Sequence, residues 1–472
     1  MARIWDFSVQ GSRLALCDDR GSTMTYEELQ QETDRLAAAV GKRCLVFALC
    51  RNEIGSILGY TAFVNHGIVP LLLNSRLEDF LLQNLIDTYA PSYLWVPKDQ
   101  SERFSDMETV YSAHGYVLIK TTQESDYPLH DALGLLLTTS GSTGSPKLVR
   151  QSYDNIICNA RSIVDYLELD AEERPITTLP MNYTYGLSII NSHLLVGAVI
   201  LVTEKDFTQR AFWDFFRETG ATSFGGVPYT YEMLDRMRFY RMKLPSLRTM
   251  TQAGGKILPD LQEKFARYAA ENGKRFIVMY GACEATARMG YLPAEMALAK
   301  KGSMGIAIPG GQFRLMDGEG REITEPDTVG ELIYEGNNVT LGYAECGADL
   351  SRGDERCGVL ETGDMAYFDE DGFFYISGRK KRFLKIYGNR VNLDEMERLI
   401  RSRFSIDAAC TGIDDHLSVF ITDETLMKPV RDYAATVTRL NPSAFQVVHI
   451  DRIPKNDSGK TLYSALEVNN GP

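Results

Sequence analysis

The sequence predicts an α/β protein: a large N-terminal domain of two parallel-type sheets with crossover helices and a small β region, then a small mobile α+β C-terminal domain. Short apolar strands alternate with helical segments of ten or more residues from residue 24 to residue 280, which is the pattern of parallel sheets with crossover helices. Short alternating segments with frequent glycine follow residue 303 and indicate the β region. A chain of 472 residues also exceeds one ordinary core.

The first elements are a capped helix and a series of strand and helix units. Residues 24–40 carry apolar side chains at helical spacing, and Thr25 and Glu28 have the spacing of a capping box. The apolar runs that follow predict strands at 44–49, 68–73 and 93–96 and helices at 53–66 and 77–88.

The same alternation resumes after residue 147. It predicts strands at 176–179, 198–202, 223–227, 249–251 and 275–279, and helices at 152–166, 187–196, 207–219, 229–238 and 259–272. The last ninety or so residues follow the order strand, helix, strand, strand, helix, strand. Because ligands bind at the carboxyl ends of parallel strands, we expect the loops after several of these strands to form one site.

Composition excludes several classes of function. Hydrophobic residues are 44% and charged residues 24% of the chain, and the net charge is −13. This charge argues against nucleic acid, or an anionic membrane, held by bulk electrostatics. Eight cysteines occur without a C-x-x-C pair, and no run of about eighteen apolar residues or apolar N-terminal stretch is present. We therefore expect a cytoplasmic enzyme without a membrane span.

Residues 138–147 follow the apolar run 135–137 and are rich in serine, threonine and glycine before Lys147. A strand followed by such a loop favours phosphate binding, because its N–H groups can turn inward and Lys147 adds a positive charge. The alternative is a Ser/Thr-rich surface turn, which is common for this composition. The spacing also differs from the G-x-x-x-x-G-K-[ST] loop, so the loop needs support from other motifs.

Further motifs follow the loop in order: Tyr-Gly-Ala-Cys-Glu at 280–284, Gly-Glu-Leu with Gly-Tyr at 330–343, Glu-Thr-Gly-Asp at 361–364, Gly-Arg-Lys-Lys at 378–381, and Pro-Lys-Asn-Asp-Ser-Gly-Lys at 454–460. Together, over nearly the whole chain, they resemble the adenylate-forming superfamily of acyl-CoA synthetases, luciferase-like ligases and peptide-synthetase adenylation domains. The resemblance implies ATP-dependent activation of a carboxylic acid with release of pyrophosphate, then acyl transfer to coenzyme A or to the phosphopantetheine of a carrier protein.

The resemblance also implies roles for individual residues. Lys460 would be the main catalytic lysine, Glu284 would bind Mg²⁺, and Lys147 would face the pyrophosphate. The positions that would bind ATP or the acceptor are Thr139, Ser140, Gly141, Ser142, Thr143, Gly144, Lys147, Gly254, Tyr280, Gly281, Cys283, Asp364, Ile376, Arg379 and Lys385. Taken alone, Glu284 could be a solvated carboxylate at a helix start, the Thr-Gly-Asp run a turn, and Lys460 a surface lysine in a glycine turn.

The same resemblance implies the domain boundaries: an N-terminal domain at 1–378, a hinge at 379–382 centred on Lys381, and a C-terminal domain at 383–472. Rotation of the C-terminal domain about the hinge would move Lys460 out of the site. It would bring in the other face of the domain, where Lys385 would lie near the path of the thiol. The terminal domain is short for the family, which leaves a carrier-protein thiol open as the acceptor. A non-catalytic nucleotide-binding homologue is the third alternative, and the retention of both Glu284 and Lys460 weighs against it.

The acyl pocket would be lined by Tyr183, Gly186, Phe224, Gly225 and Gly226. No aspartate stands near Tyr183 to pair with a substrate ammonium, which disfavours an α-amino acid. The aromatic residues favour an apolar fatty or aryl acid, although the two adjacent glycines could simply end a strand.

Cys283 occupies the position where the family usually has threonine or serine. Its thiol is a weaker hydrogen-bond donor than a hydroxyl, so adenylation could be slower or the change simply tolerated.

Overall fold

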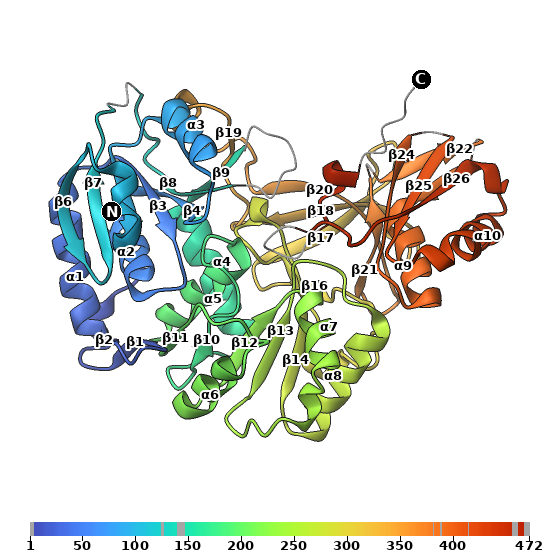
Figure 1. Cartoon of the computed structure of the whole chain (residues 1–472), viewed down its shortest axis with the longest axis horizontal. Helices are drawn as coiled ribbons and strands as arrows, with labels where there is room; N and C mark the ends of the chain where they lie inside the picture. Colours follow the sequence, from blue (N-terminus) through green and yellow to red (C-terminus); the bar gives the residue numbers. More distant parts are fainter. Residues whose placement is uncertain are drawn as a thin grey trace.

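The computed structural model describes residues 4–123, 127–138, 147–380, 382–387, 389–413, 415–455 and 461–466. Within these ranges the molecule has a large α/β body and a smaller α+β lobe at its C-terminal end, which confirms the predicted fold class. In Figure 1 the body occupies the left and centre, and the C-terminal lobe, coloured red, lies at the right.

The first large sheet has the strand order β16-β15-β14-β13-β12-β10-β11-β1-β2. Its central neighbours are parallel, as predicted, whereas β15, β16 and β2 pair antiparallel at the two edges. The strands are β1 (Leu14–Asp18), β2 (Thr23–Thr25), β10 (Pro175–Ile176), β11 (Ile200–Val202), β12 (Ser223–Gly226), β13 (Thr249–Gln252), β14 (Arg275–Tyr280), β15 (Gly290–Tyr291) and β16 (Ile306–Ala307).

The second large sheet has the order β19-β9-β8-β4-β3-β5-β7-β6. Its strands are β3 (Leu45–Cys50), β4 (Val69–Asn74), β5 (Tyr93–Pro97), β6 (Glu108–Ala113), β7 (Tyr116–Lys120), β8 (Leu133–Thr138), β9 (Leu148–Ser152) and β19 (Gly342–Ala344). The β8 and β9 strands are antiparallel, with Thr138 opposite Leu148. Thr138 and Leu148, which flank the stretch between these strands, therefore lie at the same end of the strand pair.

The third sheet is the small β region, which is antiparallel as predicted. It consists of β17 (Gly311–Met316), β18 (Gly330–Gly336), β20 (Val359–Phe368) and β21 (Phe374–Arg379). The C-terminal lobe follows with a hairpin and a three-stranded sheet: β22 (Phe383–Ile386), β23 (Asn389–Asn392), β24 (Ala408–Ile413), β25 (His416–Ile421) and β26 (Phe445–His449).

The helices of the body are α1 (Tyr26–Val40), α2 (Ile54–Asn65), α3 (Asp79–Tyr89), α4 (Tyr153–Leu167), α5 (Thr184–Leu195), α6 (Arg210–Thr219), α7 (Pro228–Arg236) and α8 (Pro259–Glu271). Those of the lobe are α9 (Leu393–Phe404) and α10 (Met427–Thr438). The predicted capping box of α1 is present, with Thr25 and Glu28 bonding each other's backbone N–H groups.

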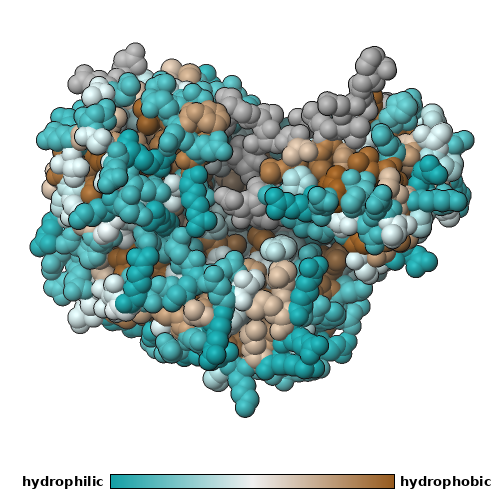
Figure 2. Space-filling view, viewed as in Figure 1, coloured by the Kyte–Doolittle hydropathy of each residue, from teal (hydrophilic) through white to brown (hydrophobic). Residues whose placement is uncertain are grey.

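Helix α2 is buried along its whole length, and α5 is buried at every residue except Leu195. They contribute Leu58 and Ile190 to one continuous core that also contains Val46 of β3 and Ile200 of β11. Both helices are therefore enclosed on nearly every side, because they pack between the two large sheets rather than over one of them. Figure 2 shows polar side chains spread over one face of the body and apolar ones gathered on part of the C-terminal lobe.

Several strands differ from the sequence-based predictions: β1, β2, β9, β15, β16 and β19 were not predicted, and two further regions differ for clear reasons. The hairpin of β6 and β7 follows the strand at 93–96 without having been predicted, because its first strand is largely exposed and lacks a strong apolar run. The predicted strand at 176–179 is only Pro175–Ile176. Beyond it, Thr177 and Thr178 bond instead through their side chains, to the carbonyls of Thr203 and Gly225.

Candidate active site

The third sheet and the first large sheet meet at a cluster of Tyr280, Asp364 and Arg379. Tyr280 ends β14, and Asp364 lies directly opposite Arg379 in the pairing of β20 with β21. The Tyr280 hydroxyl donates to one oxygen of Asp364, and Arg379 Nε lies 3.4 Å from the other. Burial and the Asp364 charge raise the pKa of Tyr280 well above its ordinary value, so the phenol remains a donor.

Gly281 allows the chain to leave β14 in this direction. A Cβ atom at Gly281 would lie 1.7 Å from the carbonyl oxygen of Ala287, so no other residue fits without moving the backbone. The glycine lets the loop fold back on itself and brings the short turn Cys283–Ala285, which carries Glu284, close to the end of the strand.

Glu284 lies in a second cluster, with Tyr343, Thr340 and Arg356. The Tyr343 hydroxyl donates to Glu284 Oε1 at 2.7 Å. Arg356 stacks 4.6 Å from the centroid of the Tyr343 ring and donates to the backbone carbonyl of Glu284 at 3.1 Å and to Thr340 Oγ1 at 2.6 Å. Burial, followed by the Glu284 charge, raises the pKa of Tyr343 to about 12. The carboxylate is therefore oriented by a neutral phenol and has no ion-pair partner within the described residues.

Lys147 approaches the same tyrosine from the second sheet. Its Nζ forms an ion pair with Glu345 at 2.8 Å and lies 5.5 Å from the Tyr343 ring centroid. The structure thus brings Lys147 and Glu284, which are far apart in sequence, to the same residue. The predicted loop positions Thr139, Ser140, Gly141, Ser142, Thr143 and Gly144 lie outside the described residues.

Arg150 holds β19, and with it Tyr343 and Glu345, against the strand that follows Lys147. Its side chain is fully buried. Nε donates to the Tyr343 carbonyl at 3.0 Å, Nη1 to the Arg352 carbonyl at 2.5 Å, and Nη2 both to the Leu341 carbonyl at 3.2 Å and to the Glu355 carboxylate. Every nitrogen of this guanidinium therefore has an acceptor, which fixes the sheet edge that carries the cluster.

The predicted acyl pocket lies around Tyr183 and Tyr185 at the start of α5. A Cβ atom at Gly254 would lie 2.6 Å from the Tyr183 hydroxyl oxygen, and one at Gly225 would lie 2.9 Å from that of Tyr185. The two rings are 6.3 Å apart. Burial, followed by the neighbouring Cys283, raises the pKa of Tyr183. The structure therefore brings Tyr183, Gly225, Gly254 and Cys283 together.

Other predicted pocket residues have different surroundings. A Cβ atom at Gly186 would lie 2.4 Å from the carbonyl oxygen of Pro180, and one at Gly226 would lie 2.9 Å from the Thr230 side chain, so both glycines serve close packing. Phe224 points to the opposite face of the sheet, where its ring packs against Trp213 and Phe239. Strand alternation explains this, because Phe224 and Gly225 must face opposite sides of β12.

The loop after β13 contacts the end of the third sheet. Lys256 Nζ donates to the Ile376 carbonyl at 2.6 Å. Burial, and then the nearby Arg398 of α9, lower the pKa of this lysine. This hydrogen bond joins the loop that contains Gly254 to β21, the strand that carries the predicted residues Ile376 and Arg379.

Lys455, at the start of the terminal motif 454–460, lies against helix α7 of the body. Lys455 forms an ion pair with Asp407 at 3.1 Å, and its Nζ lies 5.4 Å from the ring centroid of Tyr229 in α7. Lys455 also pairs as an isolated bridge with Thr461. Lys460 and Lys381 lie outside the described residues, as does the side chain of Lys385.

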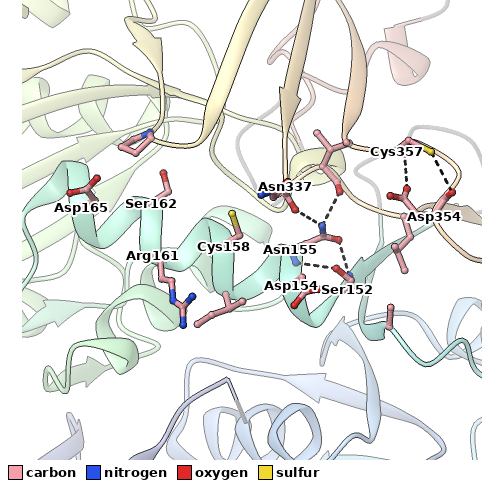
Figure 3. Close-up of a pocket in the computed structure, with 16 residues that line it drawn as sticks. Ser152, Asp154, Asn155, Cys158, Arg161, Ser162, Asp165, Asn337, Asp354 and Cys357 are labelled. Atoms are coloured by element: carbon pink, nitrogen blue, oxygen red, sulfur yellow. Dashed lines mark hydrogen bonds between the residues drawn. The ribbon is translucent and has the colours of Figure 1, made fainter. Parts of the chain in front are cut away.

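A separate pocket of about 970 Å³ lies along α4 and contains none of the predicted site residues. Figure 3 shows Asp154, Arg161 and Asp165 on its helical side, and Asn155 bonded to the Asn337 carbonyl at 2.7 Å. Its lining mixes acidic, basic and amide side chains without a common chemistry, and we assign it no part in the site.

Magnesium can be tested against the residues present. Among the described residues, no group of three or more His, Cys, Asp or Glu side chains is arranged to hold a metal ion. Mg²⁺ is usually bound by one or two carboxylates together with substrate phosphates rather than by a complete protein cage. Glu284, oriented by Tyr343, is a carboxylate of this kind and fits that requirement.

Three residues were missed by sequence reasoning: Tyr343, Arg356 and Arg288. Tyr343 was noted only as part of a motif, and Arg356 sits in a polar loop without a pattern. Arg288 is 2% exposed, and no sequence pattern indicates this, because arginine is almost never fully buried.

The fold and these clusters define a class: an α/β protein whose strand-end loops carry two clusters, Asp364 with Tyr280 and Arg379, and Glu284 with Tyr343, which Lys147 also approaches. The family model of AMP-binding enzymes matches residues 5–344. An indoleacetate–CoA ligase of Aromatoleum aromaticum is 30% identical over 401 residues, covering 80% of this chain and 78% of the relative. A 2-succinylbenzoate–CoA ligase of a Geobacillus species is 26% identical over 474 residues, covering 96% and 94%. The chain therefore belongs to the AMP-binding enzyme family.

The solved structures agree on the fold. The O-succinylbenzoate coenzyme A synthetase of Bacillus subtilis, in complex with ATP and a magnesium ion, has a TM-score of 0.78 at 21% identity and covers 97% of each chain. The predicted family, the α/β architecture and the reaction class of an ATP-dependent, AMP-forming ligase are thus confirmed. Within the described residues, no helix has both the length and the apolarity to cross a bilayer.

Proposed function

We propose that this enzyme converts a small carboxylic acid into an acyl-adenylate and then transfers the acyl group to the thiol of coenzyme A. The observation that carries the proposal is the convergence of the Tyr280–Asp364–Arg379 cluster and the Glu284–Tyr343 cluster on one short segment, 280–284. Coenzyme A is the acceptor we favour, because both relatives described above are named as CoA ligases and align with most of this chain.

In adenylation, some of these residues bind ATP and others stabilise the negative charge on its phosphates. Asp364 accepts hydrogen bonds from the ribose hydroxyls, as an ionised carboxylate does strongly, and Arg379 faces the ribose or phosphate. Lys147 faces the β and γ phosphates, and Glu284 holds Mg²⁺. Bound Mg²⁺ neutralises charge on the phosphate oxygens. Lys460 bridges the acid and the α-phosphate as negative charge builds there, so it contributes most to catalysis.

The remaining predicted positions complete the site. Thr139, Ser140, Gly141, Ser142, Thr143 and Gly144 form the phosphate loop, and Gly254, Tyr280, Gly281, Cys283 and Ile376 line the nucleotide. Tyr183 and Gly225 line the acyl pocket, which the closeness of Tyr183 to Gly254 supports, and Gly186 and Gly226 allow the close packing around it. Phe224 contributes by supporting β12 from its other face.

We also propose that residues 379–382, with Lys381 at their centre, form a hinge between a domain at 1–378 and one at 383–472. Two contacts at this boundary support it, because both are polar: the Arg379 N–H donates to Asp394 at 3.1 Å, and Asn392 donates to the Ser377 carbonyl at 2.7 Å. Such bonds can be exchanged with water at low cost when the domain turns, bringing Lys385 toward the thiol path.

A cytoplasmic location is part of the proposal, because no disulfide joins the eight cysteines in the described part of the chain and a reducing compartment suits them. A carrier-protein thiol is the alternative acceptor.

Pyrophosphate release measured with ATP, Mg²⁺ and a panel of acids tests the first half-reaction, and acyl-thioester formation with coenzyme A or a phosphopantetheinylated carrier tests the second. We expect acid-dependent pyrophosphate release and a faster thioester step with coenzyme A. ATP binding without pyrophosphate release for any acid would contradict the proposal.

A further inference from the structure

Arg288 is a buried cation in the segment between β14 and β15. Its relative exposure is 2%. Nε donates to Ser188 Oγ at 3.1 Å, Nη1 donates to the Tyr166 hydroxyl at 3.0 Å, and the guanidinium carbon lies 5.2 Å from the centroid of the Tyr185 ring. All three of these contacts are with uncharged side chains.

No carboxylate among the described residues forms an ion pair with Arg288. Arginine stays protonated in proteins, so the guanidinium carries its charge even here. A buried charge without a counter-charge is costly, and proteins normally pair such groups. The missing negative charge is therefore expected from a molecule that binds beside it.

The position of Arg288 places it at one end of the proposed acid pocket. The Tyr185 ring lies between the Arg288 guanidinium and β12, the strand that carries Gly225. The Tyr185 hydroxyl bonds Thr251 Oγ1 at 2.8 Å and lies 2.9 Å from where a Cβ on Gly225 would stand. Tyr185 also lies edge-on to Tyr183. Arg288 thus adjoins the residues that were predicted to hold the acyl chain.

The titratable groups around Arg288 do not supply a counter-charge. His193 of α5 is 4% exposed, and its Nδ1 lies 2.8 Å from the Ile189 carbonyl, while its Nε2 is buried without a partner among the described residues. Burial and the Arg288 charge lower the pKa of His193 to about 4, so the ring is neutral. The phenols of Tyr166 and Tyr185 also have raised pKa values because of their burial. The pocket end therefore keeps a net positive charge.

We infer that the acid pocket takes a carboxylic acid bearing a second carboxylate, and that this second carboxylate forms an ion pair with Arg288. The inference rests on the proposed function, because the first carboxylate must be the one that is adenylated. The aromatic residues, including the stacked pair of Tyr166 and Tyr291 at 4.3 Å, would contact the carbon chain or ring between the two carboxylates.

Matched acids test the inference. Pyrophosphate release is measured with glutarate against valerate, adipate against hexanoate, and terephthalate against 4-methylbenzoate, for the full-length wild type and Arg288→Met. We expect kcat/KM to favour the diacid at least tenfold in one or more pairs, and Arg288→Met to lower that diacid-to-monoacid ratio by about 10- to 100-fold. Arg275→Met is the matched control, because Arg275 starts β14 and already pairs with Glu168 at 3.0 Å.

The outcomes separate this inference from the proposed function. Activation of the monoacids alone, or a ratio unchanged in a folded Arg288→Met variant, overturns the inference and leaves the proposed function standing. The absence of pyrophosphate release with every acid overturns both. If Arg288→Met does not fold, Arg288→Lys decides the matter, since lysine cannot reproduce the planar fork. A several-fold fall in the ratio supports the inference, and an unchanged ratio overturns it.

Discussion

Arg150 and Arg288 are both buried arginines, and their surroundings differ most in the presence of a carboxylate. Arg150 meets four backbone carbonyls at 2.5 to 3.3 Å and the carboxylate of Glu355. Arg288 meets a serine hydroxyl and a tyrosine hydroxyl at 3.1 and 3.0 Å. The chain therefore supplies acceptors for every guanidinium nitrogen of Arg150, including a carboxylate.

The difference indicates what each cation is for. The bonds of Arg150 join β9 to β19 and so place Tyr343 next to Lys147, which makes the residue part of the framework. The charge of Arg288 is left uncompensated beside the proposed acid pocket, so it is available to a ligand. Four predictions test this contrast.

The largest effect is expected at Lys147 and Lys460, the two lysines of the proposed active site. Lys147 already pairs with Glu345 at 2.8 Å, so we expect Lys147→Ala to slow adenylation only about tenfold. Lys460→Ala should slow it by about 10²- to 10³-fold, the loss seen when a donor to a developing charge is removed. Single-turnover rates of acyl-adenylate formation measure both. A larger loss for Lys147→Ala than for Lys460→Ala would reverse the ranking.

The next effect is on stability. Arg150→Met should lower the free energy of unfolding by about 3 kcal/mol, because it leaves buried carbonyl oxygens without donors and Glu355 without its partner. Urea denaturation of the purified protein measures this loss. Arg161→Met, on the exposed side of α4, is the control and should change stability by less than about 0.5 kcal/mol. Equal values for the two variants would show that Arg150 does not hold the sheet edge.

His193 gives a pH dependence with a defined sign. Its pKa is about 4 in the folded protein against an ordinary value of 6.5. Between these two values the unfolded chain binds a proton that the folded protein does not, so stability falls as the pH falls. From pH 7 to pH 5 the loss due to His193 should be about 2 kcal/mol. Urea titrations of wild type and His193→Gln at both pH values measure the difference, and parallel pH slopes would refute the assignment.

The smallest effect is expected at Arg288 itself. Replacing a buried cation that has no carboxylate partner by an apolar side chain of similar volume is often neutral or stabilising. Arg288→Met should therefore change the free energy of unfolding by less than about 1 kcal/mol in the absence of ligand. A loss as large as that of Arg150→Met, in the same denaturation experiment, would mean that the two arginines have the same structural role.

Much of the fold could be predicted from the sequence, because strands and helices depend on local patterns. The alternation of apolar runs with helical periodicity correctly located most elements of both large sheets, and the capping box of Thr25 was found at its predicted place. One exception is β6, an exposed edge strand, whose pairing depends on the neighbouring sheet more than on its own composition.

The site was predictable only in part. The motifs identified Tyr280, Asp364 and Arg379, which meet in the structure, since their spacing is a property of the sequence. Phe224 was grouped with Gly225, yet it faces the opposite core, because one residue along a strand reverses the side.

The sequence by itself therefore determined the family, the order of most elements and the motifs of the proposed site, including a glycine at 281 where no Cβ fits. Only the tertiary structure decided which charges have partners. Lys147 finds Glu345, Arg150 finds Glu355, and Arg288 finds no carboxylate among the described residues. The physical reason is that ion pairs join residues far apart in the chain, and their partners are set by packing rather than by local pattern.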